Sequence, residues 1–193
     1  YVSGVAVYNK GIIRNGYVYG APIKMTGREY ITEEQYSANT VMGSIVAVNY
    51  ADGLVENVYS LSDIETRQVL SANDYAFCII GNNEGTLKNS FSTGDVYYGD
   101  NIRDGFGPSY RNRYTGSAAN TYYYSERDYG KTDNTRISKL VLYDTLWYSR
   151  LFNESNNSKP EQFVLNPVQI GYYPDILWPD IMPYQEYVAL PDL

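Results

Sequence analysis

A four-fold repeat is the feature that most limits how this chain can fold. A glycine is followed, at two-residue intervals, by an aliphatic residue, an asparagine and an aromatic residue, as in GTLKNSF at 85–91. The successive glycines are 42, 32 and 31 residues apart, and self-similarity at such periods is typical of repeat architectures. The copies are Gly11-Ile13-Asn15-Tyr17, Gly53-Val55-Asn57-Tyr59, Gly85-Leu87-Asn89-Phe91 and the weaker Gly116-Ala118-Asn120-Tyr122.

Each copy has the pattern of an apolar run, a polar turn and a strand. In the third copy the run is FCII at 77–80, the turn ends at Gly85, and the next residues alternate between two faces. The charged residues before the asparagines, Arg14, Glu56 and Lys88, mark the outward face. The asparagine and the aromatic residue are therefore predicted to point inward with the aliphatic residue. The turns YNKG, NYADG and GNNEG contain residues that tolerate left-handed backbone angles.

Buried asparagines need hydrogen-bond partners, because an unpaired amide in an apolar interior costs about 1–3 kcal/mol. If each repeat stacks on the last at about 4.8 Å, the four asparagines line up and bond one another as an amide ladder. This predicts an all-β fold, a right-handed parallel β-helix (β-solenoid) of about four coils over residues 1–130. Loop insertions are expected at 24–43, with a short helix beginning at 32–35, and at 99–116. An antiparallel sandwich with chance similarity is the alternative.

After about residue 130 the repeat pattern stops. Residues 140–147 have apolar side chains at near-helical spacing, which predicts one or two helical turns. NESNNSKP at 153–160 predicts a loop. Because an uncovered last strand would leave an open sheet edge, residues 131–193 are predicted to form a C-terminal cap. This cap is expected to end in an extended, proline-punctuated segment that leads toward a following domain.

Composition agrees with strands and limits the partners. Tyrosine occurs 23 times, and aromatic residues favour strands. The net charge is −7, so neither nucleic acid nor an anionic membrane is expected as a partner, because both are polyanions. No apolar run is long enough for a transmembrane helix, and a single cysteine excludes an internal disulfide. The chain opens inside a repeat, without an initiator Met or a signal peptide, which indicates that it was cut from a longer protein.

The chain contains no histidine. This excludes Ser-His and Cys-His nucleophile pairs and the common zinc sites, and Cys78, within an apolar run, is expected to be a core residue. Clustered carboxylates remain candidates for carbohydrate chemistry or for calcium binding, and solvated loop charges are the simpler interpretation. The candidates are Asp95, Asp100, Asp104, Glu126 and Asp128. No catalytic residue, cofactor or metal site is predicted.

The tyrosines offer another kind of site. Tyr17, Tyr59 and Tyr122 are predicted to stack in the core. The clusters at 97–98 and 122–124 include outward residues that could contact a ligand, because tyrosine buries area with few rotamers and keeps a polar tip. Strand propensity explains the same residues equally well.

The repeats and the C-terminal segment resemble a known family. The run Asn83-Gly85-Leu87-Asn89-Phe91-Ser92-Gly94-Asp95-Val96 is similar to the GLUG repeat. GYYPDILWP at 171–179, with Met182-Pro183-Tyr184-Gln185-Glu186 and Leu190-Pro191, is similar to the sequence that follows such repeats elsewhere. That setting is the N-terminal, non-catalytic part of Gram-positive surface zinc metalloproteases of the IgA1-protease type. The chain departs from the family because the repeats' usual Gly-Leu-Val-Gly run has mostly lost its glycines and the histidine pair of the zinc motif is absent.

The resemblance implies an extracellular bacterial protein, secreted or attached to the cell wall, in which this region is not the enzyme. The leading hypothesis is a non-catalytic β-solenoid domain that acts as a spacer or positions a host glycoprotein substrate, with adjacent domains of the parent chain as partners. A role in adhesion or virulence follows from the alternative, an adhesin-type module that binds a glycan or a host protein. A second alternative is a carbohydrate-active enzyme on a β-helix.

Overall fold

The computed structural model divides the chain into two units, Tyr1–Arg136 and Ile137–Leu193. Most of the described residues form strands in parallel sheets, as the sequence predicts. The residues that the structure describes are 1–25, 41–66, 75–98, 101–102, 116–126, 134–154, 163–164 and 175–176.

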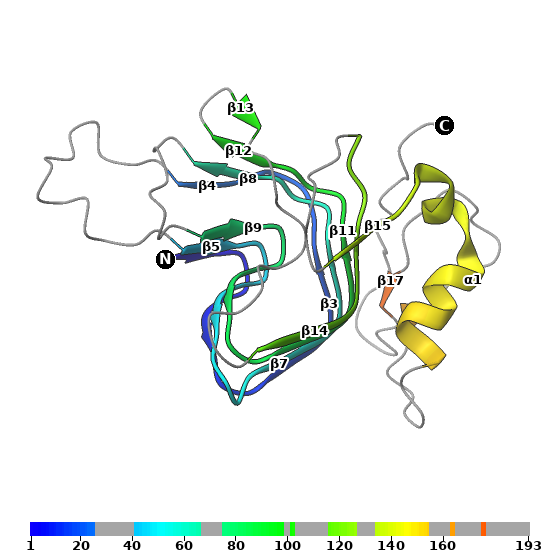
Figure 1. Ribbon diagram of the computed structural model, residues 1–193, viewed down its shortest axis with the longest axis horizontal. Helices are drawn as coiled ribbons and strands as arrows, with labels where there is room; N and C mark the ends of the chain where they lie inside the picture. Colours follow the sequence, from blue (N-terminus) through cyan, green and yellow to red (C-terminus); the bar gives the residue numbers. More distant parts are fainter. Residues whose placement is uncertain are drawn as a thin grey trace, which may run out of the picture. The chain divides into compact units, whose positions relative to one another are not determined.

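Each of the first three repeats contributes one strand to each of four sheets, so that strands far apart in sequence lie side by side (Figure 1). In hydrogen-bonded order, the first sheet is β1 (Val2–Ser3), β5 (Val41–Gly43) and β9 (Tyr75–Phe77), and the second is β2 (Ala6–Asn9), β6 (Val46–Asn49) and β10 (Ile80–Asn83). The third sheet is β3 (Ile12–Val18), β7 (Leu54–Ser60), β11 (Thr86–Ser92), β14 (Ser117–Tyr123) and β15 (Thr135–Arg136). The fourth is β4 (Ile23–Met25), β8 (Ile64–Thr66), β12 (Val96–Tyr98) and β13 (Asn101–Ile102). Every pairing among these strands is parallel except that of β12 with β13. The fourth repeat adds β14, and β15 extends the same sheet beyond residue 130, where the sequence pattern stops.

The strand register follows the repeat position by position. Val55 pairs with Ile13 on one side and with Leu87 on the other. The aromatic position behaves in the same way, with the pairs Tyr17–Tyr59, Tyr59–Phe91 and Phe91–Tyr122. The unequal lengths between repeats therefore leave the register of the long strands unchanged.

The alternation of each long strand is interrupted at its asparagine. Asn15, Asn57, Asn89 and Asn120 have φ angles of 54°, 53°, 47° and 53°, in the left-handed region that asparagine adopts more readily than most residues. The left-handed asparagines thus lie within strands. None of the described residues in the turns YNKG, NYADG and GNNEG has a positive φ, although the sequence suggested left-handed residues there.

The interruption places the aromatic residues on a different face from the one predicted. Val58 belongs to the buried cluster that contains Val55 and Leu87. Because neighbouring residues of a strand point to opposite faces, Tyr59 points away from that cluster. Ser90, predicted to face outward, is fully buried. Tyr59 and Phe91 are nevertheless buried, at 1% and 0% exposure, and their rings stack, as the sequence predicts. Only the assumption that alternation continues unbroken across the asparagine was wrong, so the rings are buried outside the aliphatic cluster.

The core of the first unit consists of aliphatic side chains that recur in each repeat. Cys78 is fully buried among them, as the sequence predicts. One cluster contains Ile45, Val46, Val55, Val58, Ile79, Ile80 and Leu87, and a second contains Met42, Ile64, Ala76, Cys78 and Val96.

The described part of the second unit contains three short helical segments where the sequence predicts one or two helical turns. These are the 3-10 helix η2 (Lys139–Tyr143), α1 (Thr145–Tyr148) and the π-helical η3 (Ser149–Glu154). The two-residue strands β16 (Phe163–Val164) and β17 (Asp175–Ile176) pair antiparallel. Among the described residues, no helix has both the length and the apolarity needed to cross a bilayer. The helix expected at 32–35 and most of the segment 171–191 lie outside the described residues.

Candidate functional site

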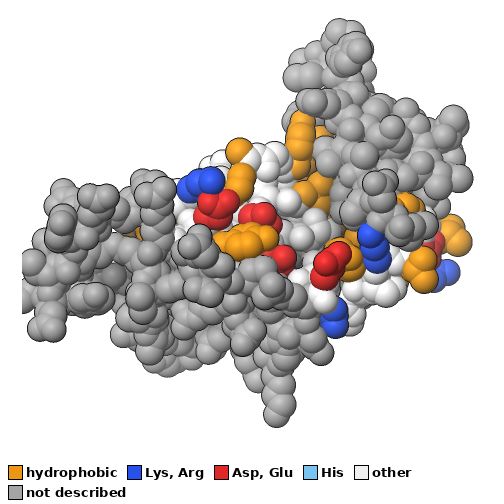
Figure 2. Space-filling model, turned by 90° about the horizontal axis from the view of Figure 1, so that it is seen from above, with side chains coloured by type: hydrophobic (Ala, Val, Ile, Leu, Met, Phe, Trp, Pro, Cys, Tyr) orange, Lys and Arg blue, Asp and Glu red, His pale blue; other side chains and the backbone are white. Residues whose placement is uncertain are grey.

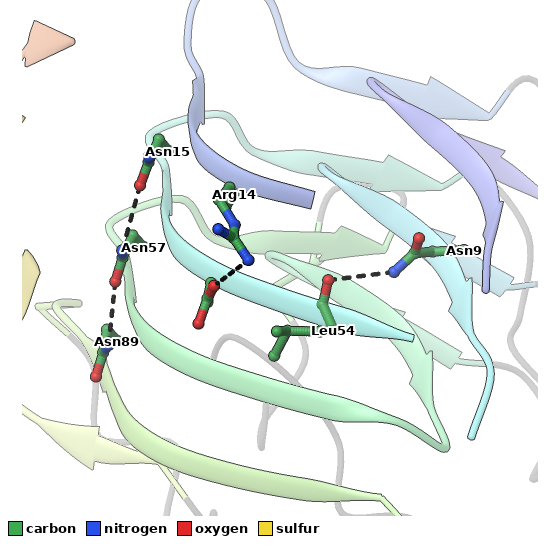
Figure 3. A network of polar contacts seen from close by, with 7 residues as sticks. Asn9, Arg14, Asn15, Leu54, Asn57 and Asn89 are labelled. Atoms are coloured by element: carbon green, nitrogen blue, oxygen red, sulfur yellow. Dashed lines mark hydrogen bonds and ion pairs between the residues drawn. The ribbon is translucent and has the colours of Figure 1, made fainter. Parts of the chain in front are cut away.

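The four asparagines of the repeat form a column of side-chain amides, which we call the first amide column. Figure 3 shows its members Asn15, Asn57 and Asn89. Nδ2 of Asn57 donates to Oδ1 of Asn15 at 3.2 Å, and Nδ2 of Asn89 donates to Oδ1 of Asn57 at 3.0 Å. Asn120 continues the column with a 3.0 Å bond to Asn89. The shared left-handed backbone gives each side chain the same direction, so consecutive repeats are joined by amide bonds as well as by their strands.

A second amide column, which the sequence analysis missed, consists of Asn9, Asn49 and Asn83. Nδ2 of Asn9 donates to Oδ1 of Asn49 at 2.8 Å, and Nδ2 of Asn49 donates to Oδ1 of Asn83 at 2.8 Å. All three side chains are buried. The signal is present in the sequence, because each of these asparagines lies shortly before the glycine of its repeat. The prediction for these turns considered only their backbone angles and not the side-chain amides.

The two columns have opposite hydrogen-bond directions. In the first column each amide donates to the preceding repeat, and in the second column each donates to the following repeat. Side-chain amides carry oriented dipoles, so the dipoles of the two columns oppose one another along the stack. The stacked repeats gain both sets of hydrogen bonds without accumulating a large net dipole.

The glycine that opens each repeat permits close approach between repeats. A Cβ added to Gly85 would collide with the carbonyl oxygens of Gly53 and Tyr50, and would lie 2.7 Å from Nδ2 of Asn49. All three atoms belong to the preceding repeat. At Gly11 the nearest atom to an added Cβ is Oδ1 of Asn9, 4.0 Å away, so the first repeat lacks this neighbour.

Charges of opposite sign pair across the outward faces of the strands. Arg14 contacts Glu56 at 3.0 Å, and Lys24 contacts Glu65 at 2.7 Å. Lys88 continues the first of these rows beside Glu56. Figure 2 likewise shows acidic and basic side chains next to each other on one face of the molecule. Exposed ion pairs of this kind each contribute about 0–1 kcal/mol to the free energy of unfolding. Their main effect is therefore to favour the observed strand register over a shifted one.

A row of aromatic side chains, two of them exposed and the third, Tyr50, half-buried, lies next to the second amide column. Ring centroids are 5.4 Å apart for Tyr1 and Tyr8 and 5.9 Å apart for Tyr8 and Tyr50, and Nζ of Lys10 lies 5.0 Å from the centroid of Tyr50. Tyr1 and Tyr8 are 57% and 52% exposed. We call Tyr1, Tyr8, Lys10 and Tyr50 the tyrosine surface.

Asn9 holds the tyrosine surface in place. Its Oδ1 accepts a hydrogen bond from the N–H of Gly11 at 3.0 Å, and its carbonyl accepts one from the N–H of Tyr50 at 2.9 Å. These bonds fix the turn that carries Tyr8 and Lys10. Aromatic faces, phenolic hydroxyls and an ammonium group together suit a sugar ring or a polar protein loop.

The described side chains of the tyrosine clusters chosen from the sequence are less exposed than Tyr1 and Tyr8. Tyr97 and Tyr122 are half-buried and Tyr123 is 3% exposed. Tyr17 and Tyr59 do stack as predicted, with centroids 4.9 Å apart and ring planes 5° apart, although on the face opposite the aliphatic cluster.

The carboxylate candidates are only partly described. Oδ1 of Asp63 accepts a hydrogen bond from the N–H of Asp95 at 2.8 Å, and Oδ1 of Asp95 accepts one from the hydroxyl of Ser125 at 3.0 Å. Burial raises the pKa of Asp63. The hydrogen bond from the N–H of Asp95 lowers this pKa in part, and the negative charges of Asp95 and Glu65 raise it further. Asp63 and Asp95 occupy equivalent positions of successive repeats, and Ser125 lies one residue before the position that matches Asp95 in the next repeat.

The other carboxylates do not join Asp95 in a described site. Glu126 is exposed, and Asp100, Asp104 and Asp128 lie outside the described residues. Within the part of the chain that the structure describes, no three Cys, Asp or Glu side chains are grouped to hold a metal ion.

Cys78 is placed for packing. Burial raises the pKa of its thiol well above the usual range, and the charge of Asp95 raises it further. The thiol donates to the carbonyl oxygen of Gly94 at 2.9 Å. A thiolate, which is the nucleophilic form, is therefore disfavoured at this position.

No protein-family model, no curated protein and no solved structure matches the chain. The resemblance to GLUG repeats and to the zinc metalloproteases of the IgA1-protease type stays a prediction from the residues that carry it.

Proposed function

We propose that residues 1–136 form a right-handed parallel β-helix that serves as a rigid, non-catalytic module of a secreted or cell-wall-attached bacterial zinc metalloprotease. In this role the module spaces the catalytic part from the surface or positions a host glycoprotein substrate. The link to a protease depends on the similarity of the C-terminal segment at 171–191 to the sequence that follows GLUG repeats. The chain itself has no histidine with which to build the zinc site of that family.

The observation that supports a rigid spacer is the pair of amide columns. Each hydrogen bond within a fold contributes about 0.5–1.5 kcal/mol, and bonds in a buried chain of amides polarise and strengthen one another. Asn57 and Asn49 each bond their counterparts in the repeats before and after them. Bending or shearing the stack would break both columns together with the strand pairing, so the module resists deformation along its length.

The spacer role is tested by deleting residues 1–136 from the parent protein. We expect kcat/KM for a short fluorogenic peptide to stay unchanged, because the catalytic part is intact. Cleavage of a large, surface-held glycoprotein should fall at least several-fold. Equal loss with both substrates would contradict a spacer role, and peptide hydrolysis by the isolated chain in the presence of Zn²⁺ would contradict a non-catalytic module.

The adhesin-type alternative is favoured by the tyrosine surface, which exposes two rings beside a lysine. If this surface binds a glycan or a host protein, Tyr8→Ala should abolish binding on a glycan array or in a pull-down with host proteins. Ile12→Ser changes an equally exposed side chain outside the surface and serves as the matched control. A blank array and a blank pull-down with the unmodified chain at high concentration would exclude this alternative.

A further inference from the structure

The first repeat forms an open edge of the stack. Its strands β1, β2, β3 and β4 each lie at the end of their sheet, and no described strand pairs with their outer side. The unpaired N–H and C=O groups of an edge strand are a template for another strand. We call these four strands the N-terminal edge.

The N-terminal edge exposes side chains that the fold buries elsewhere. Val5 is 59% exposed, whereas Ile45, at the same position of the next repeat, is 1% exposed. Ile12 is 60% exposed. Of the eight large hydrophobic side chains that are exposed among the described residues, six lie in this repeat: Tyr1, Val5, Val7, Tyr8, Ile12 and Tyr19. Exposed apolar groups of this density mark a contact surface.

Gly11 indicates what covers the edge. Gly85 has to be a glycine because carbonyl and amide groups of the preceding repeat occupy the space of a Cβ. Gly11 occupies the same position in the first repeat. The nearest atom to a Cβ added at Gly11 is Oδ1 of Asn9 in the same turn, 4.0 Å away. A glycine at this position becomes necessary when a turn of the same kind lies on the outer side of the edge.

Asn9 points to the same occupant. Oδ1 of Asn49 accepts the amide of Asn9, and Oδ1 of Asn83 accepts the amide of Asn49. Oδ1 of Asn9 accepts a bond from Gly11 N–H within its own turn. A carbonyl oxygen has two lone pairs, so Asn9 retains capacity for the amide of one more repeat.

The charge of the edge selects an acidic neighbour. Residues 1–25 carry three basic side chains and no acidic one, a net charge of +3, and residues 41–66 carry four acidic side chains and no basic one, a net charge of −4. Glu56 and Glu65 pair with Arg14 and Lys24 from one side. A second copy of the chain docked edge to edge would bring two basic repeats together, which disfavours a homodimer through this surface.

We infer that the N-terminal edge binds a further, acidic repeat of the same kind, stacked in parallel register on β1, β2, β3 and β4. A repeat in this register continues the pattern of the described strands, in which repeats that are adjacent in sequence are adjacent in the stack. The inference rests on strand pairing, packing and charge and does not depend on attachment to a protease. The test below can therefore contradict this inference without contradicting the spacer role, and the spacer role can be contradicted without affecting this inference.

The test joins a second copy of residues 41–74 directly ahead of Tyr1. This junction keeps the repeat register, because Val41 pairs with Tyr75 and Met42 pairs with both Val2 and Ala76. Hydrogen exchange is measured at the backbone amides of β2 and β3, together with the Tm of the full chain. We expect the outward amides of these strands to exchange at least about tenfold more slowly and the Tm to rise.

Two matched variants make the result specific. Replacing both Glu56 and Glu65 by Lys within the added copy only should remove much of the gain, because the charges then repel Arg14 and Lys24. Gly11→Ala should change the original chain little and should remove most of the gain in the extended chain. An extended chain that is no more stable than the original, or unchanged exchange in β2 and β3, would overturn the inference. A homodimer of the original chain with protected β2 and β3 amides would also overturn it.

Discussion

The side-chain amide of Asn89 donates a hydrogen bond to Oδ1 of Asn57 at 3.0 Å, although 32 residues separate them in the sequence. Both residues have a left-handed backbone conformation. The backbone angle and the side-chain bond support each other, because the conformation aims the amide along the stack and the bond holds the residue in that conformation.

Substitution of Asn57 separates the two contributions. Asn57→Gly keeps the left-handed backbone without strain but removes two amide bonds, and we expect a loss of about 1–3 kcal/mol in the free energy of unfolding. Asn57→Ala adds the strain of a left-handed alanine, about 1–2 kcal/mol more. Urea unfolding measures both. Asn82→Ala is the control, because Asn82 is only half-buried and bonds the nearby Glu84. A Gly variant as stable as the original chain would show that the column contributes nothing.

Gly85→Ala tests the close approach between repeats. The added methyl group would collide with backbone atoms of the preceding repeat, and overpacking of this kind costs about 1–3 kcal/mol or more. Gly16→Ala is the matched control, because nothing lies within 4 Å of the Cβ position there. The difference in Tm between the two variants is the measurement, and equal Tm values would contradict close stacking of the repeats.

The aromatic stack should show energetic coupling. Tyr59 and Phe91 have ring centroids 4.9 Å apart and planes 9° apart. In a double-mutant cycle with Tyr59→Leu and Phe91→Leu we expect a coupling energy of about 0.5–1.5 kcal/mol. The same cycle with Tyr59→Leu and Tyr8→Leu provides the comparison, because Tyr8 is an exposed residue of the same unit whose ring contacts are with Tyr1 and Tyr50. Purely additive effects of the first pair would indicate that the rings contribute only their buried area.

Asp63 should make the fold less stable as pH rises. Burial raises its pKa in the folded state, so between the ordinary aspartate pKa and the raised one the folded chain binds more protons than the unfolded chain. In that range the free energy of unfolding falls with rising pH. Asp63→Asn removes the repulsion from Asp95 and Glu65 and keeps an oxygen that accepts the Asp95 N–H.

The Asp63→Asn variant should be more stable than the original chain at pH 7 and should lose this part of the pH dependence. Thermal unfolding between pH 3 and pH 8 measures the effect. Glu126→Gln, at an exposed position, should leave the profile unchanged. A variant that is less stable at neutral pH would show that the hydrogen bond to Asp95 needs the charged carboxylate.

Cys78 provides a built-in probe of unfolding. Its thiol is fully buried and its pKa is raised, so we expect almost no reaction with iodoacetamide in the folded chain and complete reaction in urea. Because the chain has one cysteine, mass spectrometry measures the modified fraction directly. The labelling rate should increase in the Asn57 and Gly85 variants in proportion to their loss of stability. Rapid labelling of the folded original chain would contradict the burial of Cys78.

The periodic part of the fold was predictable from particular residues. The recurrence of Gly, an aliphatic residue and Asn predicted the register that pairs Val55 with Ile13 and Leu87, because equivalent residues of stacked repeats meet. The same recurrence predicted the first amide column. The charges of Arg14 and Glu56 identified the outward face of the strand.

The face of the aromatic residues and the tyrosine surface were not predictable in this way. Alternation in sequence continues unchanged through Asn57, but its positive φ shifts every following side chain to the other face. Tyr8 occupies the strand position of buried Val48 in the second repeat and of half-buried Asn82 in the third, so the repeat pattern alone does not show that Tyr8 is exposed. The sequence by itself determined which residues repeat and which strands pair, since both follow from periodicity. Only the tertiary structure decided which face each side chain takes and which repeat lies at the end of the described stack, because neither a single backbone angle nor a position at the end of a sheet is encoded in the period.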